Sequence, residues 1–138
     1  MGKNDQIFYV GLKAFIADKE KLLIVQDQES EQWELPGGKI QTGENTSYAL
    51  QRELKEEIGE IAQVKPGPVF YVWTRQPYPE QNFYLFLVGF QCTWNGGEIS
   101  LSPEHKNFRW ITKEEVDGID FENTYKDAIK QYFQTIEK

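Results

Sequence analysis

The sequence has very few residues of the kinds that form disulfides or zinc sites: one cysteine, Cys92, and one histidine, His105, in 138 residues. A single cysteine cannot form a disulfide within the chain, and a single histidine excludes a zinc site with several histidine ligands. Cys92 lies in an apolar, strand-like run, which indicates a buried and unreactive thiol. The serines have only His105 to share and no nucleophile-elbow context, which argues against a covalent Ser–His mechanism.

Long apolar runs and basic patches are also absent from the sequence. No run approaches the roughly 20 apolar residues of a transmembrane helix, and the first residues lack the apolar region of a signal peptide. Fifteen basic residues stand against 22 acidic ones, a formal net charge of −7, which disfavours binding to a nucleic-acid polymer. An anionic substrate would need a metal ion to compensate its charge. We therefore expect a cytoplasmic protein without a membrane partner, and a homodimer is left open.

The length fits one domain, which we expect to span residues 1–138. Strand-like segments cover residues 7–17, 21–26, 68–74, 83–94 and 108–111. Apolar residues recur with helical spacing over 45–58 and 124–137, and Thr112 with Glu115 resembles a capping box. A short extended piece, 33–35, is stopped by the Pro-Gly-Gly that follows it. This order predicts an α/β protein with helices on both faces of a mixed sheet.

Three carboxylates of the first predicted helix share one face. At about 100° per residue, Glu57 lies about 40° to one side of Glu53, and Glu56 about 60° to the other. Two carboxylates about 5–6 Å apart repel each other by about 0.7 kcal/mol in water. Mg²⁺ or Mn²⁺, which prefer oxygen donors, would bind between the carboxylates and offset that repulsion. A solvated helix face is the ordinary interpretation of a lone Glu-Glu pair.

The spacing of the surrounding residues decides between these interpretations. Residues 38–60 resemble the Nudix box, Gly-x5-Glu-x7-Arg-Glu-U-x-Glu-Glu-x-Gly-U, where U is aliphatic. A chance match is on the order of 10⁻⁹ per start position. The one departure is Glu60 at the last aliphatic position, which touches no metal-binding position. The matching residues are Gly38, Glu44, Arg52, Glu53, Leu54, Glu56, Glu57 and Gly59.

The resemblance to Nudix hydrolases of the MutT-like kind implies an α/β/α sandwich with a mixed β-sheet. It implies hydrolysis of a phosphoanhydride bond in a nucleoside diphosphate derivative, of the nucleoside triphosphate, ADP-ribose or dinucleoside polyphosphate type, by water activated by Mg²⁺ or Mn²⁺. Arg52 would orient Glu53, which is either a ligand or the base, and Glu44 would support the cluster. The implied metal ligands are the Gly38 carbonyl, Glu53, Glu56 and Glu57.

Weaker likeness outside the box adds further candidates. Glu104 matches a segment in which the family often supplies one more acidic ligand or base, and a solvated loop carboxylate is an equal alternative. Asp120, Phe121 and Asn123 precede the last predicted helix, in a loop that borders the base pocket of MutT-like relatives. A helix N-cap role for Asn123 is equally compatible. For the single histidine we expect a structural role.

Two alternatives stay open at this point. Aromatic residues could stack on a base, although core packing is the commoner use of aromatics in strands: Trp33, Tyr71, Trp73, Tyr78 and Trp94. The chain could also be a catalytically silent Nudix-fold module that binds or senses a nucleotide. Intact carboxylates at 53, 56 and 57 count against that alternative, and the length counts against a Nudix-type isomerase.

Overall fold

The computed structural model describes residues 2–76 and 83–137, so Tyr78 lies outside the described residues. The described elements follow the predicted order of strands and helices. They are β1 (Phe8–Asp18), β2 (Lys21–Asp27), β3 (Trp33–Glu34), β4 (Gly37–Lys39), α1 (Thr46–Ile58), β5 (Val64–Lys65), β6 (Val69–Arg75), β7 (Tyr84–Trp94), β8 (His105–Ile111), the 3-10 helix η1 (Lys113–Gly118) and α2 (Asn123–Ile136).

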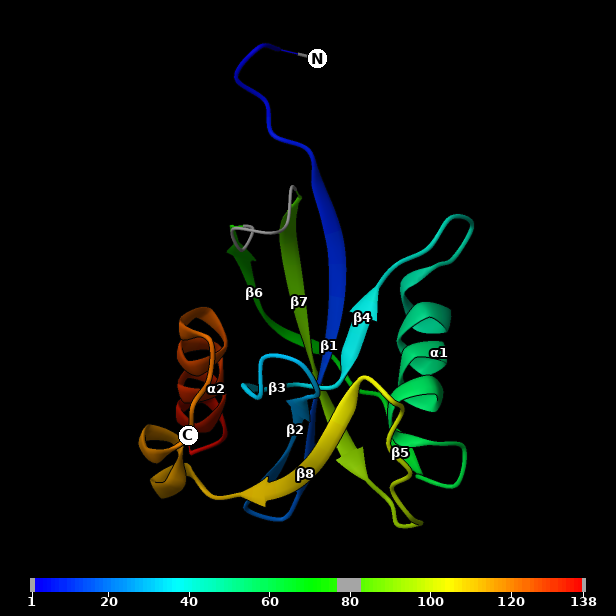
Figure 1. The fold of residues 1–138 in the computed structure, drawn as a ribbon, viewed down its shortest axis with the longest axis vertical. Coiled ribbons are helices and arrows are strands. Elements are labelled where there is room, and N and C mark those ends of the chain that lie inside the picture. The colour runs from blue at the N-terminus through cyan, green and yellow to red at the C-terminus, as the bar shows by residue number, and fades with distance from the viewer. Residues whose placement is uncertain (1, 77–82, 138) are drawn as a thin grey trace.

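The described strands form one mixed sheet. Strands β1 and β7 run parallel, in register from Phe8 opposite Tyr84 to Ala17 opposite Thr93. The other pairs are antiparallel: β4 and β2 lie against β1, β6 and β5 against β7, and β3 and β8 against β2. Helices α1 and α2 lie on opposite sides of this sheet (Figure 1). The predicted α/β fold with a mixed sheet and helices on both faces is confirmed.

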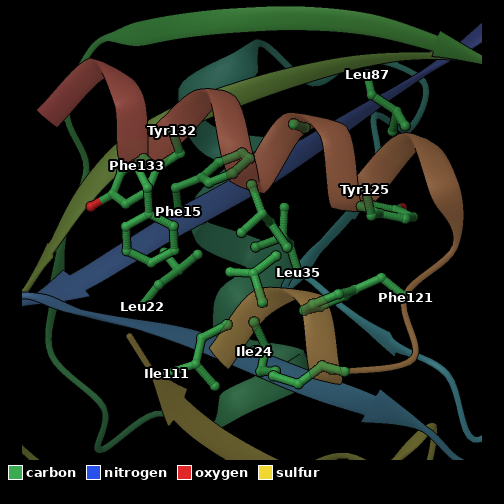
Figure 2. Packing of buried hydrophobic residues seen from close by; sticks show 14 of the residues in the cluster. Phe15, Leu22, Ile24, Leu35, Leu87, Ile111, Phe121, Tyr125, Tyr132 and Phe133 are labelled. Atoms are coloured by element: carbon green, nitrogen blue, oxygen red, sulfur yellow. The ribbon is translucent and has the colours of Figure 1, made fainter. Parts of the chain in front are cut away.

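Alternating residues of β1 explain why two helices are needed. Leu12, Ala14 and Ile16 belong to the core that α1 covers, whereas Phe15 belongs to the core that α2 covers. All four are fully buried, and burial of a Leu, Ile or Phe side chain contributes about 1.5–3 kcal/mol. Figure 2 shows the α2 side, where Phe15 lies beside Tyr132. A strand apolar on both faces is therefore stable only when each face is covered.

The ends of α1 follow from its sequence. The Asn45 side chain accepts a hydrogen bond from the Tyr48 N–H at 2.9 Å, so Asn45 is the N-cap of the predicted helix. Gly59 ends the helix with a φ of 93°, a conformation that glycine adopts without steric cost. These two ends fix the register of the carboxylates between them.

The start of α2 differs from the sequence prediction. Glu122, and not Asn123, is the N-cap: its carboxylate accepts hydrogen bonds from the Thr124 and Tyr125 N–H groups. The N-cap role considered for Asn123 is thus wrong, because a carboxylate one position earlier satisfies the free N–H groups and carries a charge that the helix dipole favours. The capping box at Thr112 is confirmed, although the helix it begins is a 3-10 helix.

Candidate active site

A cleft of about 920 Å³ is lined by residues of α1, of the strands β1, β3 and β4, of the first part of β7, and of the starts of β8 and α2. Its lining comes from segments that are far apart in the sequence. The lining includes the predicted carboxylates Glu53, Glu56 and Glu57. Within the described residues, no helix is both long and apolar enough to cross a membrane.

The three carboxylates differ strongly in exposure. Glu57 is buried, and its Oε1 accepts a hydrogen bond from the Gly37 N–H at 2.8 Å. Burial raises the pKa of Glu57 to about 7, opposed by the charge of Lys13 and the Gly37 hydrogen bond. The Glu53 side chain is 13% exposed and that of Glu56 is 58% exposed. The three carboxylates on this face of α1 therefore extend from the protein interior to solvent.

Arg52 connects the carboxylates to one another and to the preceding loop. Its Nη1 donates to Glu53 Oε1 at 2.9 Å and to Glu56 Oε2 at 3.2 Å. Its Nε and Nη2 donate to both oxygens of Glu44, and Nη2 also donates to the Lys39 carbonyl. The structure thus brings together Glu44, Arg52 and Glu53.

Two glycines allow β4 to approach its neighbours. A Cβ at Gly38 would lie 2.4 Å from the Glu53 carboxylate, so any side chain there would displace that carboxylate. Gly37 has a φ of 138°, and a Cβ at this position would lie 2.0 Å from the Leu12 carbonyl oxygen. Only glycine lets β4 pack between β1 and α1 in this way.

The carboxylate oxygens on α1 are the kind of ligand that a hard divalent cation prefers. The side chains of Glu53, Glu56 and Glu57 offer only oxygen, and all line one cleft together with Gly38. Among the described residues, however, no three acidic, histidine or cysteine side chains converge as they stand. Arg52 holds the first two carboxylates and the Gly37 N–H holds the third, so a metal ion has to compete with these contacts.

A second group of charged residues in the cleft was missed by sequence reasoning. The His105 Nε2 lies 3.0 Å from Glu34 Oε2, and the Lys13 Nζ lies 3.7 Å from Glu34 Oε1. Lys13 also donates to the Leu35 carbonyl and lies over the Tyr125 ring. A lysine within an otherwise apolar strand was the available signal, since an inward-facing charge requires a partner.

Of the candidate site residues outside the Nudix box, only some line the cleft. Glu104 lines the cleft, whereas Asp120, Phe121 and Asn123 are not among the lining residues. Phe121 is part of the buried core under α2, and Asp120 accepts a hydrogen bond from Gln32 at the surface. Glu122 and Tyr125 line the cleft instead. The three predicted residues thus lie near the cleft in sequence but do not line it in the structure.

Comparisons with known proteins find relatives of this chain in sequence and in structure. The family model for the NUDIX domain matches residues 9–133. The nucleoside triphosphatase NudI of Enterobacter sp. (strain 638) is 30% identical over 95 residues, covering 64% of this chain and 67% of that protein. The NudI protein of Escherichia coli O139:H28 is 26% identical over 91 residues, covering 62% of this chain and 64% of that protein, which is less than two thirds of its length.

Solved structures show the same fold at low identity. The MutT protein from Methanosarcina mazei Go1 superposes with a TM-score of 0.81 at 21% identity, covering 97% of this chain and 98% of that chain. A NUDIX-family hydrolase from Clostridium perfringens gives a TM-score of 0.76 at 19% identity, covering 93% and 97%.

Proposed function

We propose a function for this chain from one premise: the chain belongs to the Nudix hydrolase family, whose domain matches it from residue 9 to residue 133. The proposed reaction is hydrolysis of a phosphoanhydride bond in a nucleoside triphosphate. We choose nucleoside triphosphates over the other nucleoside diphosphate derivatives as the proposed substrate because the NudI relatives are named nucleoside triphosphatases. The chain's own support is the carboxylate series on α1, which lines the cleft beside an Arg52 that contacts two of its members.

The proposed roles follow from the positions of the side chains. The Gly38 carbonyl, Glu53, Glu56 and Glu57 would hold Mg²⁺ or Mn²⁺. When bound, the ion supplies neutralisation of phosphate charge and Lewis acidity. Where Glu53 acts as the base instead of as a ligand, it would take the proton from the attacking water, a contribution typically worth about 10²–10⁴-fold. Arg52, at 2.9 Å from Glu53, would fix the direction of that carboxylate.

A substrate panel tests the proposal. The protein is incubated with Mg²⁺ or Mn²⁺ and nucleoside triphosphates, ADP-ribose or dinucleoside polyphosphates, and phosphate and pyrophosphate release are measured. We expect turnover of at least one triphosphate, abolished by Glu53→Gln and retained by Glu60→Gln, an exposed carboxylate at the end of α1. Nucleotide binding without product release from any compound would overturn the proposal in favour of a silent nucleotide-binding module.

A further inference from the structure

Helix α1 covers only part of its face of the sheet. On this face of β1, Leu12 and Ile16 are fully buried, whereas Val10 near the start of the strand is partly exposed. On the same face of β7, Cys92 is 4% exposed and Phe86 is 38% exposed. In Figure 1 the start of β1, the end of β6 and the start of β7 extend beyond both helices. Neither described α-helix therefore covers the sheet at this end.

Strand register places a group of uncharged side chains together on this uncovered face. Val10 lies opposite Phe86 across the parallel pair, and Phe86 lies opposite Thr74 across the antiparallel pair of β6 and β7. Opposite residues of neighbouring strands share a face, and so do residues two positions apart in one strand. The group, which we call the uncovered patch, consists of Phe8, Val10, Val72, Thr74, Tyr84, Phe86 and Val88.

The uncovered patch has the composition of an interaction surface. Six of its seven members are apolar or aromatic, none carries a charge, and none is fully buried. Val72, in the middle of β6, is 47% exposed. Single apolar residues are common on protein surfaces, whereas a contiguous apolar patch marks a place where another molecule binds.

The charge distribution indicates what covers the uncovered patch. The chain has a formal net charge of −7, so two copies repel each other over most of their surface. Residues 61–76 and 83–97, which include β5, β6 and β7, contain none of the 22 acidic residues. A second copy can therefore approach on this side without setting carboxylates against carboxylates. An anionic membrane would require several basic residues beside the patch. These two ranges contain only Lys65 and Arg75, and Arg75 is buried.

We propose that the uncovered patch binds the same patch of a second copy across a two-fold axis. Two sheets can pack face to face about 10 Å apart with their side chains interdigitated, and a two-fold axis sets one patch against itself. The patch measures roughly 14 Å across three strands and 17 Å along β7. This footprint is smaller than the roughly 800 Å² that each partner buries in a standard interface, so we expect a weak dimer with a Kd on the order of micromolar or higher.

This inference does not depend on the proposed function. Of the described residues that line the cleft, none belongs to the uncovered patch. The oligomeric state is also measured without a substrate. A failure of the proposed hydrolysis therefore leaves this inference standing, and the reverse also holds.

Sedimentation velocity from about 1 to 500 µM protein, a range that brackets a micromolar Kd, tests the inference. We expect wild type to shift from monomer to dimer as its concentration rises. Val72→Lys and Phe86→Lys should each raise the dimer Kd about tenfold or more, because each dimer would then bury two like charges in an apolar interface. Ile136→Lys replaces an exposed apolar residue of α2 outside the patch and should leave the Kd unchanged.

The remaining measurements keep the test decisive if a lysine variant fails to fold. Val72→Thr keeps the β-branched shape of valine and should also weaken the dimer. Raising the NaCl concentration from about 0.05 to 0.5 M screens the repulsion between two acidic copies and should strengthen the wild-type dimer. A dimer that salt weakens is held by ion pairs, which would overturn the inference. Wild type that stays monomeric throughout would also overturn it, as would a dimer that no folded patch variant weakens.

Discussion

Arg52 and Glu53 are adjacent in sequence, yet their side chains meet: the guanidinium donates to the Glu53 carboxylate at 2.9 Å. This contact is possible because Glu44 and the Lys39 carbonyl hold the other side of the guanidinium, next to β4. Arg52 thereby determines where the proposed base points. Its planar group binds several acceptors at once, which a lysine ammonium cannot reproduce.

Replacing Arg52 by lysine should therefore lower kcat while KM changes little. Misplacement of a reacting group by about 1 Å can cost on the order of 10²-fold in rate, and we expect a loss of at least about tenfold. Steady-state kinetics on the best triphosphate of the panel measures this effect. Arg109→Lys is the matched control, since Arg109 pairs with Glu115 at the surface. An unchanged kcat in the Arg52 variant would show that Arg52 does not position Glu53.

A methyl group at Gly38 should disturb the site without unfolding the protein. The added Cβ would lie 2.4 Å from the Glu53 carboxylate, a side chain that can turn away at the cost of its proposed role. Gly38→Ala should thus lose about tenfold or more in kcat, while far-ultraviolet circular dichroism stays like that of wild type. Gly118→Ala, where an added Cβ meets nothing within 4 Å, should keep full activity. If Gly38→Ala is as active as wild type, Glu53 is not confined by β4.

Metal binding should stabilise the wild-type protein and stabilise Glu57→Gln much less. Saturation at about 100 times the dissociation constant adds roughly 2.7 kcal/mol, a melting shift of very roughly 5–10 °C in a domain of this size. The glutamine keeps an oxygen for the Gly37 N–H but removes a buried charge, so the variant should melt at or above wild type without metal. Thermal unfolding with and without Mg²⁺ at constant ionic strength measures both effects, and equal Mg²⁺ shifts would exclude Glu57 as a ligand. Excess chelator should abolish activity.

The His105–Glu34 pair should give the protein a pH-dependent stability. Burial lowers the pKa of His105, but the Glu34 hydrogen bond and the Glu57 and Glu34 charges outweigh it, so the pKa lies above its ordinary 6.5. The folded state therefore binds the proton more tightly than the unfolded chain. This stabilisation is complete below pH 6.5 and is lost as pH rises through the higher folded-state pKa.

Melting temperatures of wild type and His105→Asn from pH 5.5 to 8.5 test this prediction. The advantage of wild type should be largest at the acidic end and should shrink towards pH 8.5. Both carboxyls are present in both proteins, so the difference between the two plots of melting temperature against pH reports the loss of the histidine together with the loss of its charge beside Glu34 and Glu57. An advantage that grows with pH would contradict the raised pKa.

Local features of the sequence were sufficient for α1 and its carboxylates. The Asn45 cap, the apolar spacing and Gly59 define the helix, and the 3.6-residue repeat then puts positions 53, 56 and 57 on one face whatever the rest of the chain does. The β-branched and aromatic residues of 7–17 likewise predicted the strand β1. These relationships span at most one or two helical turns or a few strand residues, so they can be read without knowing the fold.

The Glu34 cluster depended on the tertiary structure. Glu34 and His105 are 71 positions apart, and they meet only because β3 and β8 both pair with β2. A shift of one residue in either register would turn the side chains to the opposite face of the sheet. Near the start of α2, Glu122 and Tyr125 line the cleft, whereas Phe121 lies in the core. Strand register and helix ends are fixed by the summed packing of the whole domain, which no local pattern encodes.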